Sequence, residues 1–184
     1  MAGSEQHRSL RDRLDAREVS IRGKDGKDYV LRPIQPADAP SLIRGYDAMS
    51  ERGKWFRMLH AVPHLTDEMA REFCAPDPQT ECCVVIDGRD DLSDEILGGA
   101  RVAGLGPGKA AEFSVSLRPE ARGLGLARQA LETVIEVARE TGNTEVWGLI
   151  ARQNSAMLKL AERVGFQNKR DLDDISLIRA TIAL

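Results

Sequence analysis

The chain has 184 residues, of which 42% are hydrophobic and 30% are charged, and this suits one globular domain with a substantial core. The formal net charge of −3 argues against a nucleic acid or an anionic membrane surface as partner. No stretch is apolar for the length of a membrane span, and the N-terminus lacks the apolar core of a signal peptide, so we expect a cytoplasmic protein.

The chain begins with a polar and charged segment, residues 1–17, which we expect to be a tail, either a short frayed helix or a disordered stretch. From residue 18 to residue 184 we expect a single domain. It opens with a β-hairpin, because two short apolar runs flank the turn Gly23-Lys24-Asp25-Gly26. Arg32-Pro33 then ends the second strand.

Two helices are predicted next. Pro36 and Asp38 place a proline and an acid in a first turn, and apolar residues recur at helical spacing up to Met49. Thr66 begins the second helix, which runs through Phe73. Between the two helices, residues 50–59 are predicted to be a connection with an aromatic and basic cluster, which either packs in the core or faces a substrate.

The cysteines and histidines show no metal-binding or redox spacing. Cys82 and Cys83 are adjacent on a predicted strand, so their side chains point to opposite faces, and we interpret them and Cys74 as reduced core residues. The three histidines are too scattered to form a ligand set, so we expect no metal.

Three strands are predicted in the middle of the chain. Residues 82–86 and 96–102 are apolar runs that bracket a polar loop, and they read as an antiparallel pair. A third run, residues 110–118, reverses direction after a glycine-rich turn. It leads into the turn Pro119-Glu120.

A glycine-rich hexapeptide, Arg122-Gly123-Leu124-Gly125-Leu126-Ala127, follows this strand and precedes an apolar-periodic stretch. A strand, a tight loop and a helix N-terminus together form an anion-binding arrangement, although the two glycines can also mark a simple turn. Leu126-Ala127 exclude a P-loop, which ends in Gly-Lys-Ser/Thr. Arg128 excludes a dinucleotide fingerprint, which needs a small residue there.

The rest of the chain alternates helices and strands. A helix runs from Ala127 to Gly142, residues 146–150 form a buried strand, and Asn154 is the N-cap of a last helix closed by Gly165. Residues 175–182 supply a terminal strand. These elements predict a mixed sheet with helices on both faces, in the α/β or α+β class.

The hexapeptide fits Arg/Gln-x-x-Gly-x-Gly/Ala, the pyrophosphate loop of the GNAT superfamily of N-acetyltransferases. Residues 112–127 and 154–166 together resemble the two cofactor motifs of that superfamily, and Leu31-Arg32-Pro33 through Asp38 is a weaker match. The resemblance extends from Val19 to the C-terminus. It implies the GNAT fold, a mixed, mostly antiparallel central sheet with helices on both faces.

The resemblance also implies acetyl-CoA as the acyl donor, with no metal. The family binds the pyrophosphate on the hexapeptide amides and pairs the pantetheine arm with its fourth strand, while a matching asparagine lies beside that arm. Asn154 can equally be a plain N-cap. The implied cofactor-binding residues are Val115, Ser116, Leu117, Arg122, Gly123, Leu124, Gly125, Leu126, Ala127, Arg128 and Asn154.

The implied catalytic residue is Glu112. An amine arrives as ammonium, so a base must take its proton before attack, and a partly desolvated carboxylate in mid-sheet suits that task. The alternative is a structural glutamate in solvent. Many family members use a tyrosine as general acid where this chain has Ala161, which cannot donate a proton, so water or the proton of the amine remains for the departing thiolate.

Ala111-Glu112-Phe113 and the segments around Arg32 and residues 50–68 resemble the acetyltransferase domain of bacterial Pat-type protein lysine acetyltransferases. We therefore expect an acetyl-CoA-dependent N-acetyltransferase that acts by direct transfer in a ternary complex, with a protein lysine as acceptor. A small-molecule amine is the second acceptor class, and a non-catalytic acyl-CoA-binding module is a separate alternative. The sequence leaves the acceptor, the acyl chain, the oligomeric state and any regulator open.

Overall fold

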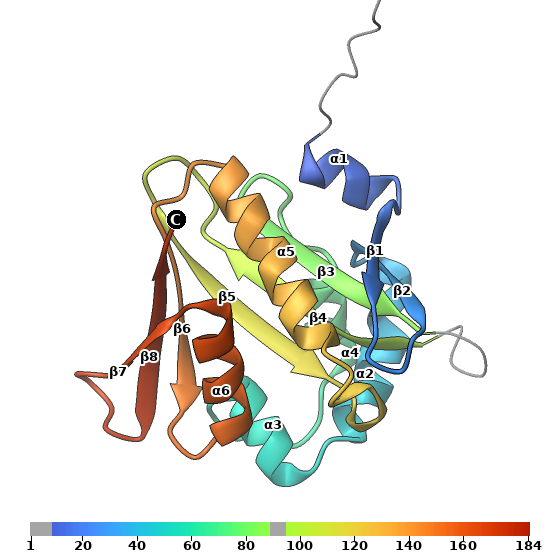
Figure 1. Cartoon of the computed structure of the whole chain (residues 1–184). Helices are drawn as coiled ribbons and strands as arrows, with labels where there is room; N and C mark the ends of the chain where they lie inside the picture. The colour runs from blue at the N-terminus through green and yellow to red at the C-terminus, as the bar shows by residue number, and fades with distance from the viewer. Residues whose placement is uncertain (1–8, 89–94) are drawn as a thin grey trace, which may run out of the picture.

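The computed structural model describes residues 9–88 and 95–184, and their backbone forms an eight-stranded sheet with helices on both faces (Figure 1). The strand order is β1-β2-β3-β4-β5-β6-β8-β7, in which β5 and β6 are parallel and the other neighbours antiparallel. This confirms the predicted mixed, mostly antiparallel sheet. The strands are β1 (Val19–Arg22), β2 (Asp28–Pro33), β3 (Glu81–Asp87), β4 (Ile96–Ala103), β5 (Ala110–Leu117), β6 (Glu145–Ala151), β7 (Gln167–Arg170) and β8 (Leu177–Ala183).

The helices divide between the two faces. In Figure 1, α5 and α6 lie in front of the sheet and α2 and α4 lie behind it. The helices are α1 (Leu10–Asp15), α2 (Ala39–Asp47), α3 (Glu51–Met58), α4 (Asp67–Phe73), α5 (Leu126–Glu140) and α6 (Ser155–Val164), with 3₁₀ turns η1 (Pro36–Asp38) and η3 (Pro119–Ala121).

The larger core lies under α5. Its apolar stripe, which includes Leu131 and Val134, is fully buried against β3, β4 and β5. Helix α1, which lies within residues 1–17, is capped by Ser9 and adds the buried Leu14 to the same core. On the opposite face, α2 and α4 bury Tyr46 and Ala70 against a second, smaller cluster.

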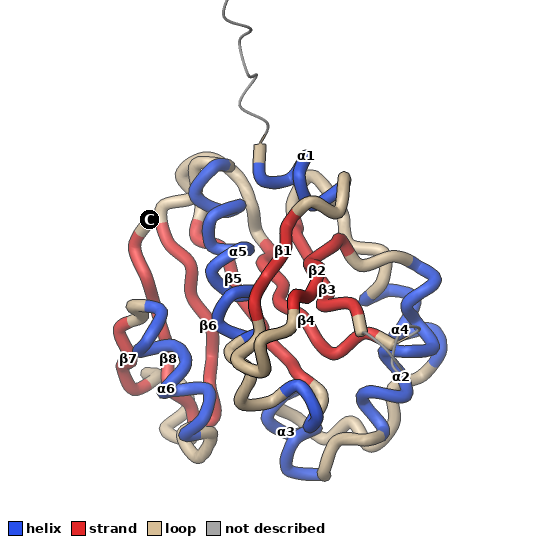
Figure 2. Tube along the Cα trace, turned by 45° about the vertical axis from the view of Figure 1, so that its right-hand side comes forward, coloured by secondary structure: helices blue, strands red, loops and turns tan. Residues whose placement is uncertain are grey.

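Helix α3 corrects one prediction, because residues 50–59 were expected to be a connecting segment and most of them form a helix. Ser50 accepts a hydrogen bond from the backbone N–H of Gly53 and begins the helix as its N-cap, and Leu59 ends it in the left-handed region at φ 57°. Its apolar side chains gather at its C-terminal end and do not form a stripe, so periodicity gave no helical signal. Figures 1 and 2 both show α3 below the diverging ends of β5 and β6.

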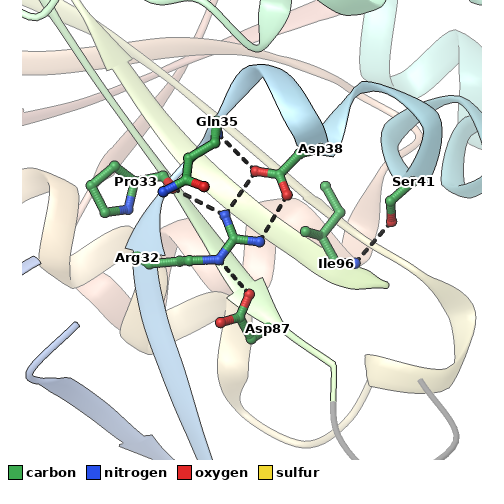
Figure 3. Close-up of polar contacts among 7 residues, drawn as sticks. All are labelled: Arg32, Pro33, Gln35, Asp38, Ser41, Asp87 and Ile96. Atoms are coloured by element: carbon green, nitrogen blue, oxygen red, sulfur yellow. Dashed lines mark hydrogen bonds and ion pairs between the residues drawn. The ribbon is translucent and has the colours of Figure 1, made fainter. Parts of the chain in front are cut away.

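A buried ion-pair network fixes the start of the second layer to the sheet (Figure 3). The Arg32 guanidinium on β2 donates to both carboxylate oxygens of Asp38, at 2.7 and 2.8 Å, and to Asp87 Oδ1 at 2.6 Å. Asp38 also accepts from the backbone N–H of Gln35 at 2.7 Å. The hydrogen bond with Asp38 raises the pKa of Arg32 despite its burial. The network therefore ties η1 and α2 to β2 and to the end of β3.

Candidate active site

The divergence of β5 from β6 creates the main opening in the sheet. The two strands pair only where Ala110 to Glu112 lie beside Glu145 to Trp147, whereas β5 stays paired with β4 as far as Leu117. Residues 113–117 therefore have no strand partner on the β6 side among the described residues, and Figure 1 shows the two strands separating there. The predicted pantetheine-binding residues Val115, Ser116 and Leu117 lie on this free edge, which can accept a ligand as an added strand.

The glycine-rich loop begins α5 without a side-chain cap. Gly125 is the N-cap residue at φ 80°, and Gly123 has φ 79°, both in the left-handed region that favours glycine. A Cβ added to Gly123 would meet no atom within 4 Å, so the space before this loop is open. Because no side chain caps the 15-residue helix, its first-turn amides can receive an anion.

The β1–β2 turn holds this loop in place, a contact that the sequence did not predict. The Lys24 backbone N–H donates to the carbonyl of Leu124 at 3.0 Å. Gln129 Nε2 donates to the backbone carbonyl of Arg22 at 2.8 Å, and Gln129 Oε1 accepts from the backbone N–H of Arg22 at 3.1 Å. The loop and the first turn of α5 are thus hydrogen-bonded to the β1–β2 hairpin.

Asn154 has the predicted capping role. Its Oδ1 accepts from the backbone N–H of Met157 at 3.2 Å, at the beginning of α6 and just beyond the end of β6. The cap uses the oxygen and leaves the amide nitrogen able to donate to a ligand in the opening. Ala161 of the same helix is fully buried in the larger core, where it offers only a methyl group.

Glu112 is the last residue of β5 that pairs with β6, and it lies between Ala103 on β4 and Trp147 on β6. Side chains alternate along a strand, so Glu112 is on the same face as Ser114 and Ser116. The expectation of partial burial is not met, since the side chain is exposed. Its β4 neighbour is an alanine, which covers little of the carboxylate.

A pocket of about 90 Å³ lies on this same face, between the sheet and the layer of α2, α3 and α4. Ser114 and Ser116 line it from β5, and Arg57 and Met58 line it from α3. Trp55 is 37% exposed and does not line this pocket. The aromatic and basic cluster is therefore divided between a pocket wall and the protein surface.

A second ion-pair network closes the far end of the pocket. Arg118, directly after β5, pairs with Glu95 and also donates to the Ser41 carbonyl at 3.0 Å. Glu95 further accepts from Ser41 Oγ at 2.6 Å and from Arg44 Nε at 2.5 Å. Burial raises the pKa of Glu95, but these hydrogen bonds and the charge of Arg118 outweigh it and leave the pKa below its usual value. No sequence signal identified this network.

The cysteines behave as predicted core residues. Cys82 packs in the larger core and Cys83 against the smaller one, on opposite faces of β3, and no described cysteine forms a disulfide. Burial raises the pKa of Cys83 to about 12 and that of Cys82 to about 11, so neither is a thiolate nucleophile near neutral pH. Among the described residues no three His, Cys, Asp or Glu side chains gather as a metal site, and none of the described helices could span a membrane.

Comparison with known proteins places the chain in a family. Residues 28–167 match the family model of the acetyltransferase (GNAT) domain. An acetyltransferase of Pseudomonas aeruginosa is 24% identical over 160 residues, which cover 87% of this chain and 86% of that protein.

Solved structures share the fold at low sequence identity. The GNAT domain of S. lividans PAT has a TM-score of 0.81 at 23% identity, and the match covers 90% of this chain and 96% of that one. A spermidine N-acetyltransferase from Vibrio cholerae, solved with CoA and spermine, has a TM-score of 0.66 at 16% identity and coverages of 84% and 95%. At these identities the likeness supports the fold and not the acceptor.

Proposed function

The chain belongs to the GNAT family of acetyltransferases, and we propose that it transfers the acetyl group of acetyl-CoA directly to a primary amine, first of all a protein lysine. One observation carries the proposal. The open glycine loop and the free edge of β5 are continuous in the chain, and they lead back to Glu112 at the point where the strands separate.

The donor half of the site would be built from backbone groups. The amides of residues 123–128 would hold the pyrophosphate, since no side chain caps the helix and the space before Gly123 is open. Val115, Ser116 and Leu117 would pair with the pantetheine arm along the free edge of β5, and Asn154 would face the arm from the end of β6. Arg122 is exposed at the entrance to the loop and adds a positive charge beside the phosphates.

The acceptor half would carry out the proton transfer. A lysine has a pKa of about 10.4 in water and reaches the site as ammonium, so Glu112 would take one proton. The free amine would then attack the thioester carbonyl, and a β5 amide would stabilise the oxyanion of the tetrahedral intermediate. Collapse expels CoA as a thiolate. Water or the proton of the amine would protonate that thiolate, because Ala161 cannot donate one.

Exposed apolar side chains on α3 and in the β7–β8 connection support a macromolecular acceptor. Leu172 is 97% exposed and Ile175 81% exposed in the β7–β8 connection, and Trp55 and Ile175 line a shallow cleft beside Gln153. Large exposed apolar side chains near a site are typical of protein-binding surfaces. The resemblance to Pat-type enzymes agrees with a lysine acceptor, and the spermidine enzyme among the similar structures keeps a small amine as the second candidate.

The test is acetyl transfer across a panel of proteins and small amines, with the variant Glu112→Gln. Loss of a positioned base should lower turnover by about 10² or more, while acetyl-CoA affinity stays unchanged because the donor half is separate. The acidic limb of the pH–rate profile should also disappear. Glu72→Gln, an exposed change on α4, is the control. Parent-like turnover in Glu112→Gln would refute the base, and a parent that binds acetyl-CoA but never consumes the thioester would indicate a binding module.

A further inference from the structure

The pocket beside Ser114 is strongly one-sided in charge. Arg57 from α3, Arg101 from β4 and Arg118 from the end of β5 all line it, and its described lining contains no aspartate or glutamate. The remaining wall is mostly apolar. An apolar wall strengthens the field of a charge beside it. The charge of a bound ligand therefore depends on which of these arginines already has a carboxylate partner.

The three arginines differ in how well they are neutralised. Arg118 is paired with Glu95 and hydrogen-bonded to Ser41. Among the described residues Arg101 has one carboxylate partner, since its Nη2 lies 2.5 Å from Glu81 Oε1. The buried Nε–H groups of Arg101 and Arg118 both have no hydrogen-bond acceptor there. No carboxylate of the described residues pairs with Arg57.

Arg57 and Arg101 are close enough to affect each other. Burial lowers the pKa of Arg57 and the charge of Arg101 lowers it further, while nearby Cys83 and Tyr46 act in the opposite direction. Two guanidinium groups that share a partly buried site without an anion between them are unfavourable. An acceptor oxygen placed between them would satisfy the buried Nε–H and relieve the repulsion.

We propose that Arg57 and Arg101 bind a carboxylate of the acceptor, so that the enzyme selects a protein lysine with an acidic side chain close to it. This inference rests on the proposed function. Arg101 lies directly beside Ser114 in the sheet, and Ser114 is two residues from Glu112 on the same face, a separation of about 7 Å at the usual rise of a strand. One acceptor segment can therefore present its amine to Glu112 and its carboxylate to the arginines.

The same charges disfavour a polycationic acceptor. A polyamine that placed one amine at Glu112 would bring a second ammonium toward Arg57 and Arg101. Arg179 adds a further cation on this face, with its guanidinium 3.9 Å from the centre of the Trp147 ring beside Glu112. The acceptor preference should therefore be opposite to that of a spermidine N-acetyltransferase.

The experiment compares acceptor peptides that differ only in charge near the lysine. Peptides with Asp or Glu beside the lysine should show kcat/KM about tenfold to a hundredfold higher than the matched Asn or Gln peptides, the range of a charge-assisted hydrogen bond. Arg57→Met should abolish this ratio and Arg57→Lys should retain part of it. Arg163→Met, an exposed change on α6, should leave the ratio intact. Equal use of acidic and amide peptides by the parent would overturn the inference, although the proposed function would stand.

Two further arms identify the source of the carboxylate. 6-Aminohexanoate and its amide provide the same contrast in a small amine, and a carboxylate preference seen only there would overturn the assignment to a protein side chain. Spermidine should be a poor acceptor for the parent and a better one for Arg57→Glu, whereas efficient use by the parent would contradict the inference.

A binding measurement separates this inference from the proposed function. Calorimetry with lysine-acetylated peptides needs no turnover, so it reports on the pocket even if no acceptor is consumed. Tighter binding of the acidic peptide that is lost in Arg57→Met supports the carboxylate site. Equal affinity of the acidic and amide peptides overturns it. Absence of transfer to every acceptor would instead contradict the proposed function alone.

Discussion

Two replacements of Gly125 separate the backbone role of this glycine from its proposed role in anion binding. An alanine at φ 80° costs about 1–2 kcal/mol of backbone strain, and its Cβ would meet only the Lys24 side chain, at 3.7 Å. For a domain of this size the strain should lower Tm by roughly 2–8 °C. Gly125→Ala should therefore fold with modestly weaker acetyl-CoA binding.

Gly125→Glu carries the same strain and adds an anion. A carboxylate about 4 Å from one phosphate charge, at an effective dielectric constant of about 20, costs about 4 kcal/mol, and solvent screening reduces this. We expect acetyl-CoA affinity to fall at least about a hundredfold relative to Gly125→Ala, measured by calorimetry, with a similar Tm for the two variants. If Gly125→Glu folds and binds acetyl-CoA as Gly125→Ala does, the loop is only a turn.

Two further predictions concern the ion-pair networks. Asp38→Asn leaves the buried Arg32 with one carboxylate partner, Asp87, and should lower the free energy of unfolding, measured with denaturant, by about 3 kcal/mol. The control Asp28→Asn removes an exposed pair and should lower it by under about 1 kcal/mol. Equal losses in the two variants would contradict the argument. The folded-state pKa of Glu95 lies below its unfolded value of about 4.5, so the ionised side chain stabilises the folded protein. This stabilisation is complete above about pH 4.5 and is lost as the pH falls through the folded-state pKa. Thermal melts between pH 6 and pH 3 should therefore show a smaller acid-induced loss in Glu95→Gln than in the parent, and parallel curves would refute this.

The elements that were predictable from the sequence are those determined by residues close together in the chain. The apolar stripe of α5 repeats at helical spacing, and Thr66 and Asn154 both cap helices through hydrogen bonds to amides three residues on. The hairpin of β1 and β2 follows from its glycine-containing turn.

The elements that were missed depend on contacts distant in sequence. Strand β7 is polar and mostly exposed at the sheet edge, so it shows no apolar alternation, and it is held by pairing with β8. The Arg118–Glu95 pair joins residues 23 positions apart, and the Lys24–Leu124 hydrogen bond joins residues 100 positions apart. Arg57 was visible as one basic residue in a cluster, but its place in one pocket wall with Arg101 of β4 could not be read from α3.

This contrast explains why the acceptor is harder to predict than the donor. The proposed donor half consists of backbone groups whose exposure is encoded locally, by glycines and by the end of the β5–β6 pairing. The proposed acceptor half depends on side-chain charges from separate elements, with Glu112 exposed on β5 and Arg57 and Arg101 lining the neighbouring pocket. Family membership therefore establishes the acetyl transfer. Under the proposed acceptor site, the charges of the pocket would select among amines, because an ammonium would be attracted to Glu112 and repelled by Arg57 and Arg101.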